Sequence, residues 1–168
     1  MNPFSFNQKH SEVTLEYLKA QIEQAFAGVE FPGDDHLSDT YDQSEIEDFQ
    51  GNNWQHWNQI DCYLVNKNYS SLVFLTPEAF RFFLPIYIMC GLEHPSSNTL
   101  EFTVYSLILR NNSDDPELSK LCLSWFNILN SEQKKAVVLF LKYVRSKSEY
   151  GISDSASEAL QSYWLHTQ

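Results

Sequence analysis

The sequence predicts a mainly α-helical, compact single domain of six to seven helices, with room for one short strand or hairpin. Seven segments combine a helix-start signal with apolar side chains at helical spacing. Only five Gly and six Pro occur, which is few for the many turns of an all-β fold. Apolar residues make up 43% of the chain, enough for a substantial core. We expect one domain over residues 13–168, preceded by a flexible tail over residues 1–12.

The first half of the chain carries three of the expected elements. Apolar residues at helical spacing predict a first helix over residues 14–28. Ser44 and Glu47 have the spacing of a capping box, so we expect a short second helix that ends at Gly51. Residues 71–75, Ser-Leu-Val-Phe-Leu, fit a short strand or an extended lead-in to the next helix.

The third expected helix is the most apolar segment of the chain. Residues 76–78, Thr-Pro-Glu, provide a cap, a proline suited to the first turn and an acid at the positive helix end. The helix that follows is apolar nearly all round as far as Cys90, which predicts a buried, central element. Pro85 should kink it and Gly91 should end it.

Four more helices are expected in the second half of the chain. Each has a cap residue followed by an apolar stripe, and the third of them has Gln133 at the capping-box position. The predicted caps are Asn98, Asp115, Asn130 and Ser155. Trp125 and Trp164 lie on these apolar stripes and are expected in the core.

The net charge of −11 comes almost wholly from one segment of the chain. No Lys or Arg occurs between Lys19 and Lys67, whereas the rest of the chain is nearly balanced. The segment between them contains ten acids: Glu23, Glu30, Asp34, Asp35, Asp39, Asp42, Glu45, Glu47, Asp48 and Asp61. Like charges held together lower stability unless something compensates them, so this segment is a candidate surface for a cationic partner.

Two interpretations of the acidic segment are open. In the first it is a solvated face, or it pairs internally with a basic helix around residues 134–147. In the second it is a docking surface for a basic protein, since acids steer association and aromatic residues anchor it. The candidate binding residues are Asp34, Asp35, Asp39, Asp42, Glu45, Glu47 and Asp48, with the aromatic residues Tyr41, Phe49 and Trp54.

The three cysteines, Cys62, Cys90 and Cys122, are odd in number and far apart. This pattern favours a reduced, cytoplasmic chain over a disulfide framework or a zinc site. The first residues lack the basic and apolar regions of a signal peptide, so none is expected. The longest apolar run, residues 82–90, is too short to span a membrane.

No familiar catalytic or cofactor motif is present. The spacing of a calcium loop is absent from the cluster formed by Asp34, Asp35, His36, Asp39 and Asp42, so no metal is expected, and no cofactor either. The chain has no phosphate-binding glycine loop and no basic stripe, which argues against direct nucleic-acid binding. Arg81 is expected to pair with a carboxylate or helix carbonyls, because a buried charge must be compensated. His56 is expected to be a half-buried packing residue.

Two stretches resemble a bacterial family of small cytoplasmic proteins of unknown function. The more specific is Phe-Leu-Thr-Pro-Glu-Ala-Phe-Arg at residues 74–81, which continues to Leu84-Pro85. The other covers residues 24–34, and the likeness runs from about Ala25 to Tyr87, more faintly to residues 130–141. The resemblance implies a small bacterial accessory protein, and it implies no established activity, cofactor or catalytic residue.

We therefore expect a non-catalytic binding protein, an immunity-type inhibitor that neutralises a basic bacterial toxin or effector domain through the acidic segment. The active site of a nucleic-acid-targeting toxin is built to receive phosphates, so an acidic surface complements it. One alternative is an enzyme whose site assembles from dispersed residues such as His56, Arg81 and Asp61. Another is a structural or regulatory accessory protein without a single cationic partner.

Overall fold

The structure, a computed structural model, describes residues 13–40, 43–110 and 116–166. Within these ranges the chain forms seven α-helices and six 3-10 helices, without a strand, so the expected mainly α-helical fold is confirmed. The α-helices are α1 (Leu15–Phe26), α2 (Cys62–Lys67), α3 (Pro77–Glu93), α4 (Asn98–Ser106), α5 (Pro116–Asn127), α6 (Ser131–Ser146) and α7 (Ser153–Ser162). The predicted tail, residues 1–12, lies outside the described residues.

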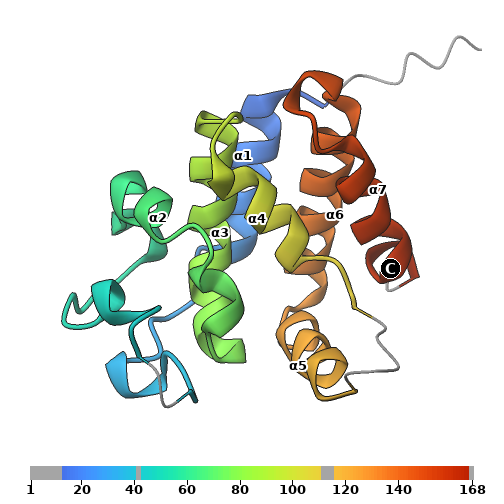
Figure 1. The fold of residues 1–168 in the computed structure, drawn as a ribbon. Coiled ribbons are helices and arrows are strands. Elements are labelled where there is room, and N and C mark those ends of the chain that lie inside the picture. The colour runs from blue at the N-terminus through green and yellow to red at the C-terminus, as the bar shows by residue number, and fades with distance from the viewer. Residues whose placement is uncertain (1–12, 41–42, 111–115, 167–168) are drawn as a thin grey trace, which may run out of the picture.

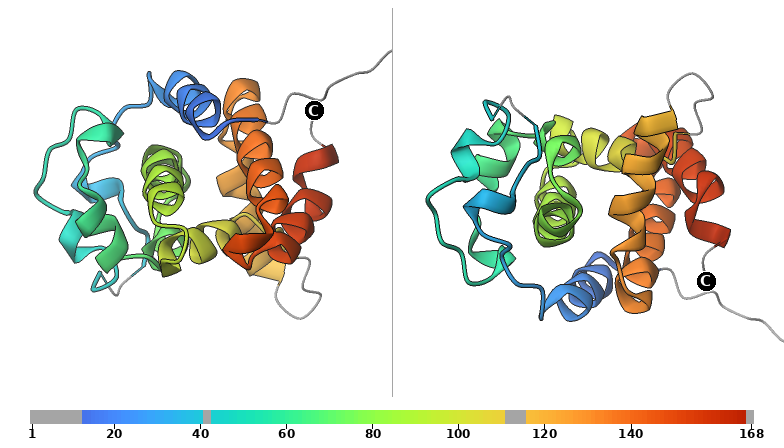
Figure 2. Two further views of the ribbon diagram at one scale, coloured as in Figure 1. Left: turned by 90° about the horizontal axis from the view of Figure 1, so that it is seen from above. Right: turned by 90° about the horizontal axis from the view of Figure 1, so that it is seen from below.

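Helix α3 stands at the centre of the molecule, as its apolar sequence predicts. Viewed along its axis it is surrounded by the other elements, with α1, α4 and α6 among them (Figures 1 and 2). Twelve of its 17 residues are buried. Trp125 of α5 stacks on Phe80 of α3, with ring centroids 5.4 Å apart, and Trp164 is likewise fully buried. Both tryptophans belong to the core, as expected.

Helix starts follow their local sequence closely. The Thr76 hydroxyl accepts a hydrogen bond from the Ala79 amide at 3.2 Å, which caps α3. Asn130 and Gln133 form the predicted capping box at α6, with hydrogen bonds of 2.9 and 3.1 Å. The start of α4 is one residue earlier than predicted, since Ser97 occupies the cap position. The predicted cap Ser155 is also wrong, because it lies inside α7, which begins at Ser153. The predicted cap Asp115 lies outside the described residues.

Gly91 does not end α3, contrary to the prediction. The helix continues to Glu93, and Gly91 faces α4 at a very close approach. A Cβ atom at this position would lie 2.9 Å from the Leu100 Cα atom, closer than real Cβ atoms come. The glycine therefore permits two helices to pack tightly, which is a tertiary role that the local sequence does not reveal.

Two short segments adopt a different type of secondary structure from the one predicted. The expected helix of residues 44–51 is a single 3-10 turn, Glu47–Phe49, and the possible strand at 71–75 is a 3-10 helix, Ser71–Phe74. Ile46 and Phe49 are both buried, and residues three apart lie on the same side of a 3-10 turn. One turn therefore suffices to bury both side chains. Helix α2, with six residues, was missed because it is shorter than the apolar period can reveal.

Cys62 and Cys90 form a disulfide that joins α2 to α3, with Cα atoms 5.4 Å apart. The expectation of a wholly reduced chain is therefore wrong. The two cysteines are 28 positions apart in the sequence, so their proximity depends on the tertiary fold. Cys122 is free and buried, and burial raises the pKa of its thiol.

A thiol count tests this cysteine assignment. The unreduced native protein should react slowly with a thiol reagent at pH 8, because a raised pKa leaves Cys122 less thiolate than an ordinary cysteine has. Unfolding without reductant should expose one reactive thiol per chain, and unfolding with reductant three, as the sequence contains three Cys. Three reactive thiols without reductant would contradict the disulfide.

Candidate functional site

The acidic segment is firmly attached to the core, although it contains little regular structure. The side chains of Leu37, Ile46 and Phe49 are at most 1% exposed. At the start of α3, the Thr76 amide donates to the Leu37 carbonyl at 2.9 Å, and the Thr76 hydroxyl donates to the His36 carbonyl at 2.6 Å. Thr76 thus caps α3 and ties the segment to it, which gives the segment a defined position.

Two of the candidate carboxylates have structural partners. Asp34 accepts a hydrogen bond from the Gly51 amide at 2.7 Å and so closes the loop between them. Asp48 pairs with Lys67 at 2.7 Å and also accepts from the Asn68 amide group at 2.9 Å. Lys67 is the first base after the acidic gap in the sequence. These two acids therefore hold the loop in shape.

Besides Glu23 on α1 and Asp61 at the start of α2, five other acids of the segment are exposed and have no ion pair with any described residue. We call them the acidic surface: Glu30, Asp35, Asp39, Glu45 and Glu47. The candidate residues Tyr41 and Asp42 fall in the same segment and lie outside the described residues. The carboxylates that remain free to meet a cation are thus held on a well-anchored loop.

The basic helix α6 does not neutralise the acidic surface. The two lie on opposite sides of α3, with the acidic segment in pale blue and α6 in orange (Figures 1 and 2). Lys134 donates to the Tyr163 hydroxyl at 2.9 Å, and Lys135 pairs with Glu132 at 2.8 Å. The interpretation of α6 as the internal partner is wrong for the residues that the structure describes.

The aromatic candidates divide into a buried and an accessible one. Phe49 has no exposed surface and packs on Phe83 of α3, with ring centroids 4.8 Å apart, so a partner docking on this loop would not contact it. Trp54 is half-buried and meets Phe31 edge to face at 5.7 Å. Of the two aromatic candidates that the structure describes, Trp54 offers its ring to a partner and Phe49 does not.

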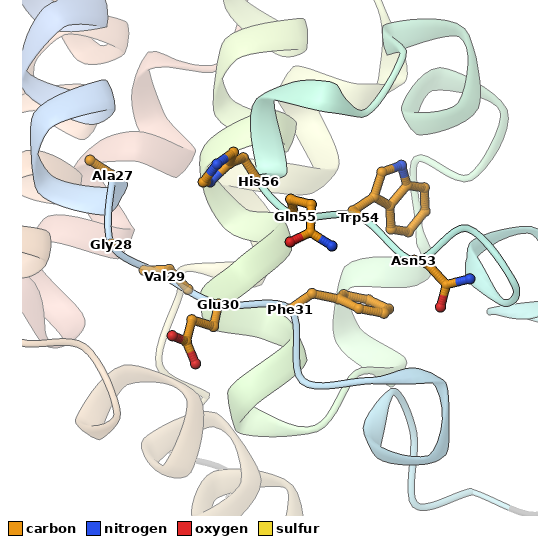
Figure 3. A pocket seen from close by; sticks show the side chains of 9 residues that line it. All are labelled: Ala27, Gly28, Val29, Glu30, Phe31, Asn53, Trp54, Gln55 and His56. Atoms are coloured by element: carbon orange, nitrogen blue, oxygen red, sulfur yellow. The ribbon is translucent and has the colours of Figure 1, made fainter.

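Trp54 and Phe31 sit in an open hollow of about 500 Å³, the Trp54 hollow. Two chain segments line it, residues 27–31 and 53–56, which run side by side in opposite directions (Figure 3). Glu30 of the acidic surface is one of the lining residues, so the hollow adjoins that surface. A cationic partner that meets the carboxylates would therefore find an aromatic recess next to them.

The three residues of the enzyme alternative have different surroundings, and no hydrogen bond or ion pair between described residues joins them. His56 is exposed, not half-buried as expected, and lines the Trp54 hollow. The Asp61 carboxylate caps α2 by accepting from the Tyr63 amide at 2.8 Å. Arg81 lines a different hollow beside residues 28–32. Among the described residues, no group of three His, Cys, Asp or Glu side chains is arranged to hold a metal ion.

Among the described residues, Arg81 has no carboxylate or carbonyl partner, contrary to the prediction from the sequence. Its Nε atom is buried without a hydrogen-bond acceptor, and none of the ion pairs between described residues includes it. No signal in the sequence could have predicted the unpaired guanidinium, because its lack of a partner among the described residues depends on which carboxylates the fold places close to Arg81.

Asp48 provides a test of the loop geometry through its pKa. The hydrogen bond from Lys67 lowers the pKa of this carboxyl, with a further contribution from Asn68. Its stabilising effect is therefore present above the ordinary carboxyl pKa and is lost as the pH falls through the lowered value. In an NMR titration, Lys67→Met should raise the pKa of Asp48. An unchanged value would show that the pair does not form in solution.

None of the helices in the described part of the chain has the length and apolar character needed to cross a membrane.

Comparison with known proteins identifies the family alone. A model of a family of unknown function, DUF6714, matches residues 14–168, so the chain belongs to this family. No match was found among curated proteins or among solved structures.

Proposed function

We propose that this member of a family of unknown function is a non-catalytic binding protein whose acidic surface binds a basic partner protein. The observation that carries the proposal is the set of five exposed carboxylates that form no ion pair with a described residue, on a loop anchored to the central helix. A net charge of −11 adds a long-range field of the same sign.

The anchoring of the loop supports binding in a second way. A loop already held in one conformation loses little conformational entropy when a partner docks on it. Exposed carboxylates accelerate encounter with a cationic surface, while an aromatic ring in a recess supplies burial and slows dissociation. The acidic surface and the Trp54 hollow provide these two elements next to each other.

We further propose that the partner is a bacterial toxin that acts on nucleic acid, and that this chain is its immunity-type inhibitor. A toxin of that class needs a basic cleft to receive phosphates, and a surface of fixed carboxylates competes for such a cleft. The motif at residues 74–81, which resembles a family of small bacterial proteins, supports the bacterial source.

The Cys62–Cys90 disulfide bears on where the inhibitor acts. The sequence suggests the cytoplasm, but disulfides are rare there because thiols are kept reduced. Alkylation of free thiols while source cells are lysed directly in denaturant decides between the cytoplasm and an oxidising compartment, because unfolding exposes the buried cysteines. One blocked thiol per chain would place the protein in an oxidising compartment, and three would place it in the cytoplasm.

Capture of the partner tests the proposed function. Three tagged forms are incubated with a lysate of source cells: the wild type, a variant with Asp35, Asp39, Glu45 and Glu47 changed to Lys, and a control. The control reverses four exposed acids outside the segment, Glu16, Glu149, Asp154 and Glu158, and so has the same net charge. A basic protein should be retained by the wild type and the control and lost by the first variant.

The captured protein is then expressed in a bacterial host with and without the inhibitor. Expression alone should stop growth, and co-expression of the wild type should restore it. A captured protein that leaves growth unaffected would contradict the toxin assignment, while binding that is equal for all three forms would contradict the acidic surface.

A further inference from the structure

Arg81 is a cation in an unusual setting. It projects from the second turn of α3, where its Nε atom is buried without a hydrogen-bond acceptor. It is not part of any ion pair between described residues. A buried donor left without a partner is unfavourable, and more so on a charged group. Of the guanidinium nitrogens, only Nε is both buried and without an acceptor, so an acceptor from outside the chain would reach the terminal Nη atoms.

The space beside Arg81 is large enough for a small molecule. We call it the Arg81 hollow, with a volume of about 430 Å³. Segment 28–32 forms one wall, and Glu78 and Ile128 complete the lining. Val29, Phe31 and Ile128 supply apolar surface, so the hollow combines a charged end with apolar walls.

The charges around the hollow restrict which charged groups a ligand can carry. Two carboxylates, Glu30 and Glu78, line it together with the single guanidinium. A phosphate, with nearly two negative charges, would meet repulsion from both glutamates. A carboxylate has one negative charge, and a neighbouring ammonium group on the same molecule would meet the glutamates favourably.

We propose that the Arg81 hollow binds a free α-amino acid with an apolar side chain. The ligand carboxylate accepts hydrogen bonds from the Arg81 guanidinium, and its ammonium group faces Glu30 and Glu78. Its side chain lies against Val29, Phe31 and Ile128. The Arg81 hollow shares Glu30 with the acidic surface, but amino-acid binding there does not depend on the proposed toxin partner.

NMR of arginine side chains tests the proposal directly. The chain contains three arginines, Arg81, Arg110 and Arg145, so the Nε–H region of the spectrum is simple. Arg81→Lys assigns one signal by its loss, and Arg145→Lys, on the exposed face of α6, is the matched control. The probe is L-leucine, and the Arg81 signal should shift and saturate while the Arg110 and Arg145 signals stay in place.

Two analogues of leucine separate the contributions of its charged groups. Loss of the ammonium group, in 4-methylpentanoate, and loss of the carboxylate, in 3-methylbutylamine, should each weaken binding about tenfold or more, the loss expected for a charge-assisted hydrogen bond. Calorimetry with Arg81→Lys should show weaker leucine binding, and Arg145→Lys should bind as the wild type does.

The analogue series needs only the wild-type protein, so the proposal remains testable if Arg81→Lys is unstable. No shift of the Arg81 signal at saturating leucine would overturn it. Tighter binding of 4-methylpentanoate or inorganic phosphate than of leucine would also overturn it, because the site would then select an anion. Neither result would affect capture of a basic protein by the acidic surface.

Discussion

Replacing Phe83 by alanine is expected to lower the free energy of unfolding by about 3–5 kcal/mol. The ring is fully buried in the middle of α3. It contacts three rings from the acidic half of the chain, those of Phe31, Phe49 and Trp54, with centroids 6.4, 4.8 and 5.6 Å away. Truncation would leave a cavity that these rings cannot easily fill, because each is also held by its own neighbours.

Chemical denaturation measures this effect, and Phe102→Ala is the matched control. Phe102 lies on α4 and is 39% exposed, so the same truncation removes much less buried surface. We expect the control to lose clearly less stability than Phe83→Ala. A loss below about 1 kcal/mol for Phe83→Ala would place the ring at the surface and contradict the central position of α3.

A variant with four reversed charges is expected to associate with the basic partner more slowly by roughly one to two orders of magnitude. In this variant Lys replaces Asp35, Asp39, Glu45 and Glu47. All four are exposed, and none forms an ion pair with a described residue. Asp34 and Asp48 are left unchanged because their hydrogen bonds shape the loop. The fold should therefore survive the change, which circular dichroism checks.

Trp54→Ala should change the dissociation rate constant rather than the association rate constant. If the ring anchors the partner in the Trp54 hollow, its loss should mainly speed dissociation and leave association nearly unchanged. Because Trp54 also packs on Phe83, its stability must be compared with that of the wild type first.

The helices were predictable wherever their signals are local. Thr76 with Pro77, and Asn130 with Gln133, cap α3 and α6 as their sequence indicates, because a cap depends on residues three positions apart. The apolar character of α3 likewise predicted its burial, since a helix that is apolar all round has no side suited to solvent.

The features that escaped prediction depend on contacts distant in sequence. Gly91 serves the approach of Leu100, and Cys62 meets Cys90 only after α2 has packed on α3. In the candidate site, charge alone pointed to the acidic segment. It could not separate Asp34 and Asp48, which hold the loop, from the exposed acids, nor show that Phe49 lies in the core.

The central claim is that the acidic surface receives a cationic partner, and association kinetics across a salt series test it most directly. The wild-type association rate constant should fall steeply as salt rises, because exposed charges are screened beyond about 8–10 Å at physiological ionic strength. The variant with four reversed acids should associate slowly at every salt concentration, while the control with reversals at Glu16, Glu149, Asp154 and Glu158 should keep most of the wild-type rate and its salt dependence. Equal rate constants and equal salt dependence for the wild type and the four-acid variant would show that the acidic surface only faces solvent.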